Sequence, residues 1–178
     1  MTVVYEPVGV DGYQLCQPID PSGFALINKA IGGNGSLKGW KPPTMRFVNV
    51  DKRKKLKESD SPWLSSSALI FRKEACERLE EIPNLDAEFL RFDCDGIDLF
   101  FLKPPIVGNI LDTERSDISW FDDGRIMAIW RPVFRNDLIR DIVAFKISDL
   151  DVSPTFVTQA FLESWSKGGL RGLDFRKV

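Results

Sequence analysis

The most constraining stretch of this sequence is the dipeptide Asp95-Gly96, which lies between two apolar-rich runs. The run before it reads EFLRFDC and the run after it reads IDLFFLK, and both contain the aromatic and branched residues that strands favour. Asp-Gly suits the type I′ turn of a two-residue loop, because both central positions of that turn need a positive φ. The sequence therefore predicts an antiparallel hairpin over residues 87–104.

Short strands and short helices are expected along the rest of the chain. Strands are predicted for TVVYEP (2–7), MRFVNV (45–50), ALIF (68–71), RIMAIWRPVF (125–134), DIVAFKIS (141–148) and LRGLDF (170–175). Helices are predicted for 23–31, for about ten residues from Arg72, and for the segment that leads to Lys167. NILDTERSDISWF (109–121) is expected to be irregular or briefly helical, and Asp122-Asp123-Gly124 to be a turn. These patterns predict an α+β fold, a single domain over residues 1–178 with a mainly antiparallel sheet and a few short helices packed on it.

Three glycines near the end of the chain, in SKGGLRGLDF, raise the question of a phosphate site. A phosphate-binding loop needs its glycines before a helix, so that free N–H groups and the positive end of the helix meet the anion. Here TFVTQAFLESWSK comes first, with Thr158 as the expected N-cap. Gly168 or Gly169 then fits the left-handed position that ends a helix. The cluster is interpreted as a helix stop followed by a last strand.

The chain contains no histidine, which is the commonest general base and metal ligand in proteins. Its absence excludes Ser–His–Asp and Cys–His catalysis and the histidine-dependent zinc sites. Carboxylate or lysine chemistry stays open, but no catalytic set is recognisable, so a non-enzymatic protein without a cofactor is predicted. A small carboxylate-dependent hydrolase remains the alternative.

Three cysteines, Cys16, Cys76 and Cys94, have neither the spacing of a zinc site nor that of a disulfide framework, and reduced core thiols are expected. The N-terminal residues lack the basic and apolar regions of a secretory signal. No apolar run approaches the roughly 18 residues of a membrane helix. A cytoplasmic protein without a membrane partner is predicted.

The net charge of −2 conceals an uneven distribution. Residues 74–123 contain 14 acidic and 4 basic side chains, a balance of −10, whereas both flanking regions are net positive. Such a region can steer a basic partner at short range. Its candidate contacts are Asp93, Asp95, Asp122 and Asp123. Ordinary turn chemistry is nevertheless the favoured interpretation of the FDCDGID group, with a metal site and a catalytic acid pair as alternatives. The residues after Asp93 do not follow the spacing of a calcium loop.

A basic segment, DKRKKLK (51–57), is the alternative binding site. Five basic residues from Lys52 to Lys57 could neutralise phosphates of a nucleic acid. Nucleic-acid binders usually add stacking aromatic residues or a second basic surface, and neither lies nearby in the sequence. A solvated loop is the favoured interpretation, with nucleic-acid contact kept open.

Five tryptophans are spread along the chain, at positions 40, 63, 120, 130 and 165. Packing in or beside the core is the default expectation for each of them. One or two could instead anchor a protein interface, where tryptophan is enriched.

Three segments read together resemble a bacterial family once catalogued as a domain of unknown function and assigned as immunity proteins of polymorphic toxin systems. The segments are SPWLSSSALIFRKEACERL, DLFFLKPPIVGNILDTERSDI and AFKISDLDVSPTFVTQAFLESWSKGGLRGLDF. Their motifs are Ser67 to Leu79, then Leu111-Asp112 with Ser116, then the GL-x-G-x-x-F close formed by Gly169-Leu170, Gly172 and Phe175. The similarity covers residues 61–178, whereas residues 1–60 are a loop-rich part that does not align. Arg72, where the family often has serine, and the pair Pro104-Pro105 depart from the pattern.

The resemblance implies inhibition by binding. An immunity protein occupies a cognate toxin domain inside the producing bacterium, and it needs no cofactor. Many such toxins are basic nucleases, which the acidic region would suit. No catalytic residue is carried over from the family.

Overall fold

The computed structural model describes residues 2–33, 37–48 and 55–178. The predicted basic segment and the end of the MRFVNV strand lie partly outside these residues, since 49–54 are not described. The strands are β1 (Val4–Gly9), β2 (Leu15–Pro18), β3 (Met45–Val48), β4 (Ile70–Arg72), β5 (Glu88–Cys94), β6 (Ile97–Lys103), β7 (Ile106–Val107), β8 (Asp117–Trp120), β9 (Ile126–Arg131), β10 (Ala144–Ile147), β11 (Phe156–Thr158) and β12 (Leu173–Lys177). The helices are α1 (Ser22–Gly32), α2 (Lys73–Glu80), α3 (Asn136–Ile139) and α4 (Gln159–Lys167).

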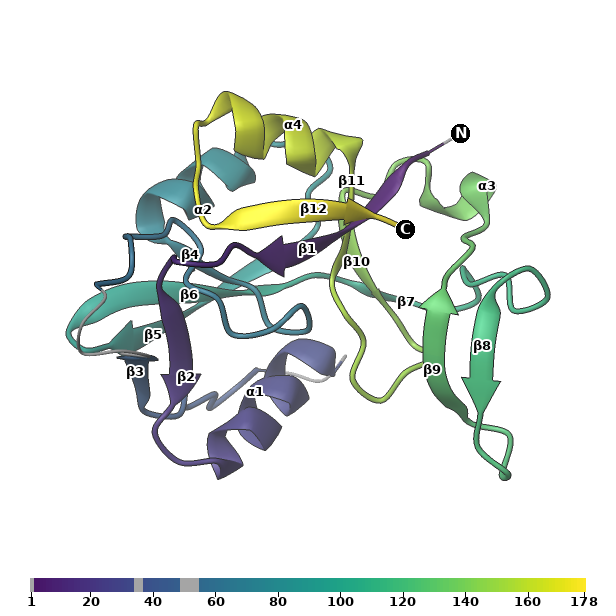
Figure 1. Cartoon of the computed structure of the whole chain (residues 1–178), viewed down its shortest axis with the longest axis horizontal. Coiled ribbons are helices and arrows are strands. Elements are labelled where there is room, and N and C mark those ends of the chain that lie inside the picture. Colours follow the sequence, from purple (N-terminus) through teal and green to yellow (C-terminus); the bar gives the residue numbers. More distant parts are fainter. Residues whose placement is uncertain (1, 34–36, 49–54) are drawn as a thin grey trace.

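The strands form two five-stranded sheets and one separate hairpin (Figure 1). The first sheet has the order β12-β1-β11-β10-β7, and the second has the order β2-β3-β5-β6-β4. All their pairings are antiparallel except β10 with β7 and β3 with β5. The predicted α+β class with a mainly antiparallel arrangement is therefore confirmed. The first 60 residues contribute β1 to the middle of one sheet, and β2 and β3 to the edge of the other.

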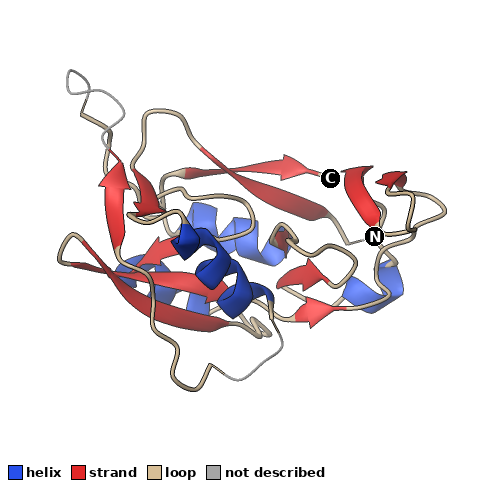
Figure 2. Ribbon diagram, turned by 90° about the horizontal axis from the view of Figure 1, so that it is seen from below, coloured by secondary structure: helices blue, strands red, loops and turns tan. Residues whose placement is uncertain are grey.

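Alternate residues of each strand point to opposite faces, so each sheet has two faces to bury. One face of each sheet packs into the same core cluster. Phe71 and Leu102 of the second sheet and Val157 of the first belong to a single buried cluster, which α2 and α4 cover with Leu79 and Phe161. A second cluster lies between the other face of the second sheet and α1. A third lies on the other face of the first sheet, next to the β8–β9 hairpin. In the view of Figure 2 the longest strands run along two borders of the molecule, with the helices between them in projection.

The β5–β6 hairpin confirms the strongest prediction of the sequence. Its strands are joined by Asp95 and Gly96, whose φ angles of 52° and 82° are both positive, as a type I′ turn requires. Phe92 and Phe101 stack across the pair at a centroid distance of 4.3 Å, and both are buried. This hairpin therefore forms the centre of the second sheet.

The glycines near the end of the chain stop α4, as predicted. Gly169 has a φ of 63° and donates its N–H to Ser166 O, while the N–H of Leu170 reaches Trp165 O, the two bonds of a Schellman motif. Gly172 has a φ of 109°, and a Cβ there would lie 1.8 Å from Ser59 Oγ, so no other residue fits this approach.

Two predictions need correction. Thr158 precedes α4, but its hydroxyl donates to Ile142 O at 3.0 Å instead of capping the helix, because β11 lies against the 142–143 backbone. Within the segment 109–121, which was expected to be irregular, Asp117–Trp120 form strand β8. None of the helices among the described residues is both long and apolar enough to cross a lipid bilayer.

A candidate protein-binding surface

The β8–β9 hairpin stands at one end of the molecule, outside both five-stranded sheets (Figure 1). Its inner face is apolar: Ile118, Ile126 and Ile129 pack against the third core cluster. Ile126 and Ile129 are three residues apart, so a regular strand would place them on opposite faces. They share a face because the register is interrupted at Met127, which lies between them; a second interruption, at Trp130, lies beyond Ile129.

Each interruption is a β-bulge that adds one residue to β9. Asp117 pairs with Arg131 and Ile118 with Ile129, which leaves Trp130 without a cross-strand partner. In the same way, Met127 lies between two paired positions and has no partner on β8. Bulges re-aim side chains, and these two turn a tryptophan and a methionine outward while the isoleucines stay inside.

Four large apolar side chains of this hairpin are exposed to solvent. They are Trp120 (49% exposed), Phe121 (44%), Met127 (51%) and Trp130 (71%), named here the hairpin set. Among the described residues, Trp130 is the most exposed large apolar side chain. Its indole Nε1 donates to Ser119 Oγ at 2.9 Å, which holds the ring in one orientation. A fixed, solvated tryptophan is typical of an interface anchor.

Two of the four predicted acidic residues lie at the tip of this hairpin. Asp122 and Asp123 occupy the turn, followed by Gly124 with a φ of 82°. Asp123 accepts hydrogen bonds from the backbone N–H and the Nε of Arg125, at 3.1 and 2.9 Å. Arg125 also lies over the Phe121 ring, 5.4 Å from its centroid. The tip is therefore ordered, and the Asp122 carboxylate is exposed beside it.

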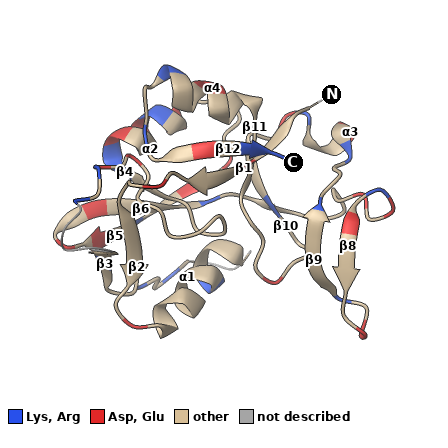
Figure 3. Ribbon diagram, viewed as in Figure 1, with Lys and Arg blue, Asp and Glu red and all other residues tan. Residues whose placement is uncertain are grey.

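The other two predicted acidic residues lie elsewhere, at the turn of the β5–β6 hairpin. Asp93 accepts from Gly96 N at 3.2 Å, and Asp95 accepts from Phe47 N at 2.8 Å. The Asp93 carboxylate therefore stabilises the turn itself, as the interpretation as turn chemistry held, whereas the Asp95 carboxylate joins the turn to β3. The two hairpin turns lie toward opposite ends of the long axis, so the four residues do not form one acidic surface (Figure 3).

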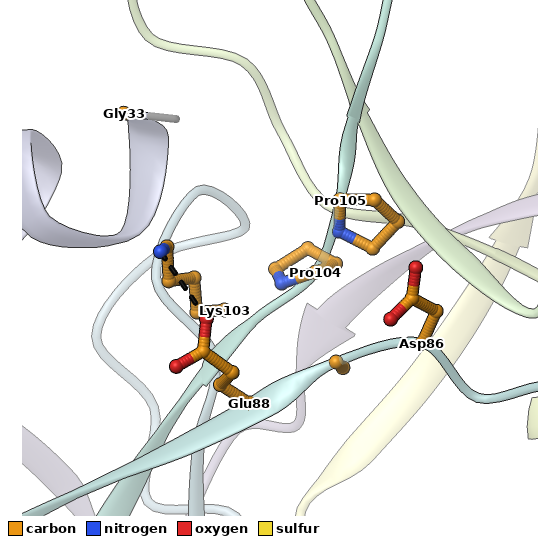
Figure 4. Close-up of a pocket in the computed structure, with 7 residues that line it drawn as sticks. Gly33, Asp86, Glu88, Lys103, Pro104 and Pro105 are labelled. Carbon is orange, nitrogen blue, oxygen red and sulfur yellow. Dashed lines mark hydrogen bonds and ion pairs between the residues drawn. The ribbon is translucent and has the colours of Figure 1, made fainter. Parts of the chain in front are cut away.

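A cavity of about 250 Å³ between the end of α1 and the start of β5 contains two carboxylates, those of Asp86 and Glu88 (Figure 4). Glu88 pairs with Lys103, Oε1 to Nζ 3.3 Å, while Asp86 points toward Pro105 (Figure 4). Both acidic residues are exposed. A general acid needs a carboxyl group whose charged form is disfavoured by burial, and neither residue has that environment.

Lys146 is the most unusual titratable residue, because it is 2% exposed and forms no ion pair with a carboxylate among the described residues. Its Nζ donates to Ser67 O and Ser153 O, at 2.6 and 2.7 Å. Burial lowers the pKa of this amine to about 8. Both bonds are to backbone carbonyls that tie separate segments together, so the residue serves the fold.

The three cysteines are buried and free, as predicted. Cys16 and Cys94 lie with their sulfur atoms 3.3 Å apart, and hydrogen bonding to Cys94 together with burial raises the pKa of Cys16. Burial raises the pKa of Cys76 to about 12. Within the described ranges, no group of three or more potential metal ligands comes together.

The hairpin set is the feature that sequence reasoning did not predict. The tryptophans were expected to pack in or beside the core, and Trp165 does so. Trp120 and Trp130 are instead exposed. Trp130 is the residue that a bulge leaves unpaired, whereas Trp120 pairs with Ile126 in the register. The useful signal was the spacing of Ile126 and Ile129. Both can lie on the buried face of one strand only if a bulge adds a residue between them.

No family model matches the chain, and no curated protein is similar to it. The assignment of a function depends on the surface described above and on the motifs of the sequence.

Proposed function

We propose that this chain is an immunity protein that binds and neutralises a cognate toxin domain in the cytoplasm of the producing bacterium, with the β8–β9 hairpin as its contact surface. The observation that carries the proposal is the hairpin set, four large apolar side chains exposed on one projecting hairpin. Monomeric proteins seldom leave such residues together in water unless a partner covers them.

The construction of the hairpin supports binding without rearrangement. Its inner isoleucines are anchored in the third core cluster, so the strands have a rigid base. The hydrogen bond from Trp130 to Ser119 holds the largest outer ring before any partner arrives. Little conformational entropy is then lost on association, which favours the tight complex that neutralisation requires.

The acidic tip supports a partner with a basic surface at that position. Asp122 and Asp123 are exposed at the end of the hairpin that projects farthest (Figure 1). Charges at the rim of an interface mainly raise the association rate. A basic nuclease domain is the class of toxin that this tip would steer.

Two alternatives have less support. A carboxylate-dependent enzyme needs paired acids in a desolvated site, and the exposed Asp86 and Glu88 in the cavity beside β5 do not provide one. A nucleic-acid module would use Lys52 to Lys57, of which 52–54 lie outside the described residues. Lys57 itself lies over the Tyr13 ring at 5.7 Å, which engages it within the fold.

Co-expression tests the proposal. The toxin domain encoded beside the gene for this chain is induced in a heterologous bacterium, alone or with the wild-type chain. Growth is expected to be restored by the wild-type chain and lost again with Trp130→Ala. Toxicity that persists with abundant wild-type chain, together with no complex on size-exclusion chromatography of the purified pair, would refute immunity.

A further inference from the structure

A second cavity, of about 300 Å³, opens between β9 and the end of β12. Its lining is Glu6, Ile129, Trp130, Arg131, Pro132, Leu150, Pro154, Phe156, Arg176, Lys177 and Val178. It thus adjoins the most exposed member of the hairpin set. Figure 3 shows basic residues at the C-terminal ends of both β9 and β12, the two strands that border it.

The charge of this cavity is opposite to that of the hairpin tip. Three cations line it, Arg131, Arg176 and Lys177, against the single side-chain carboxylate of Glu6. Glu6 is already paired with Arg176, Oε2 to Nη2 2.5 Å. Arg131 and Lys177 have no ion-pair partner within the part of the chain that the structure describes, although Asp117 lies opposite Arg131 in the β8 register. Two positive charges therefore remain available to a ligand.

The rest of the lining is apolar. Leu150, Pro132 and Pro154 surround the space, and Trp130 forms one rim. Such a combination fits a ligand with an apolar body and a negative charge at its edge. A protein segment meets this description better than a nucleic acid, because Trp130 is the one exposed aromatic ring among the lining residues, whereas successive bases stack on several rings.

We propose that this cavity binds an acidic segment of the partner protein, which places a large apolar side chain against Trp130 and an adjacent Asp or Glu between Arg131 and Lys177. The inference rests on the proposed function, in which the hairpin is the contact surface. It adds that the partner must present an acidic surface to the C-terminal end of β9, at Arg131, and a basic surface to the hairpin turn at Asp122 and Asp123. This polarity fixes the orientation of the two proteins, because a reversed complex would bring like charges together.

Peptide selection tests the proposal without the toxin. A phage-displayed library of random 12-residue peptides is selected against the purified full chain and counter-selected against the double variant R131E/K177E. Enriched peptides are expected to carry Asp or Glu next to Trp, Phe or Leu. Synthetic copies should bind at least about tenfold more weakly to R131E/K177E or Trp130→Ala by fluorescence anisotropy.

A matched control separates local from general charge effects. The variant K29E/K41E makes the same change of charge at two exposed lysines outside the cavity, and it should retain wild-type affinity. Peptides in which lysine replaces the acidic residue should bind R131E/K177E better than the wild type. Thermal unfolding confirms that each variant is folded.

Other outcomes overturn the inference. Enriched peptides without acidic residues, equal binding to R131E/K177E, or a selection that yields no peptide dependent on Trp130 would each do so. Binding of a fluorescent single-stranded oligonucleotide at about 50 mM salt, lost in R131E/K177E, would assign the cavity to nucleic acid instead.

The two proposals fail separately. If R131E/K177E still rescues growth in the co-expression assay while Trp130→Ala does not, immunity stands and the acidic segment is refuted. If acidic peptides are selected but the wild-type chain does not rescue growth, immunity falls and the chemistry of the cavity stands.

Discussion

The hairpins β5–β6 and β8–β9 differ in how they bury their large apolar side chains. β5–β6 turns at Asp95-Gly96 in strict register, and its Phe92 and Phe101 are buried in the core cluster beside α1. β8–β9 turns at Asp123-Gly124 with two bulges, and it exposes tryptophan and methionine to water. The regular hairpin buries most of its large apolar side chains within the fold, whereas the irregular one leaves four exposed to solvent. In the proposed function, these four side chains are the contact surface.

The largest predicted effect is a loss of stability on substitution in the β5–β6 hairpin. Phe101→Ala should lower the free energy of unfolding by about 3–5 kcal/mol, because it empties a fully buried site and removes the ring that stacks on Phe92. Trp130→Ala should change it by less than about 0.5 kcal/mol, since that ring is 71% exposed. Urea denaturation followed by circular dichroism measures both, and comparable losses would erase the distinction between the hairpins.

For affinity, in contrast to stability, substitution in the β8–β9 hairpin should have the larger effect. Trp130→Ala should weaken the complex with the toxin domain by about 2 kcal/mol or more, as expected for a central tryptophan anchor. Ile97→Ala is the matched control, because Ile97 is also exposed, at 38%, but belongs to the β5–β6 hairpin. Isothermal titration calorimetry compares the two. A stronger effect at Ile97 would move the interface to the other end of the molecule.

Lys146 joins the segment before β4 to the loop before β11, and its titration should make the stability of the fold depend on pH. It binds Ser67 O, ahead of β4, and Ser153 O, in the loop beside the cavity next to β9. Its pKa is about 8 in the folded protein against 10.5 ordinarily, so the unfolded chain holds the extra proton between these values. Stability contributed by this group therefore rises as the pH increases from 8 toward 10.5, by about 1 kcal/mol from pH 8 to 9.

The comparison with Lys146→Met isolates that effect. The pKa of Cys76 is raised to about 12, so between pH 9 and 12 the thiol stays protonated in the folded protein but ionises in the unfolded chain. This difference lowers stability above about pH 9 in both proteins. The difference between wild type and variant removes this shared contribution. Urea midpoints at pH 7.5, 8.5 and 9.5 should diverge, and parallel curves would show that Lys146 titrates normally.

The smallest predicted effect concerns the hairpin tips. Charge reversal of Asp122 and Asp123 to lysine should slow association with a basic toxin domain by a few-fold at low salt, with little change in the dissociation rate. The same change at Asp93 should leave the association rate unaltered, because that carboxylate belongs to the other turn. Stopped-flow measurements at about 20 and 200 mM salt provide the check. Rates that do not depend on Asp122 and Asp123 would dismiss steering.

The sequence predicted what local rules determine. The Asp95-Gly96 turn, the helix that begins near Arg72 and the glycine stop of α4 each follow from residues within a few positions of one another, and all are present. The exposure of Trp130 followed from no local rule, since it depends on which strand lies opposite and where the register slips. Likewise, the cavity beside it joins β9 to residues of β1 and β12, which lie far away along the chain.

The position of β1 has a consequence for synthesis on the ribosome. Its two neighbours in the sheet are β11 and β12, so roughly 150 residues must follow it before either can pair. At about 5–20 residues per second, β1 waits on the order of 10–30 s with both edges unpaired. Such long-range pairing slows folding, and the nascent chain must be protected from aggregation during this interval. β12, which is synthesised after the four other strands of the sheet, is thus the one that completes it.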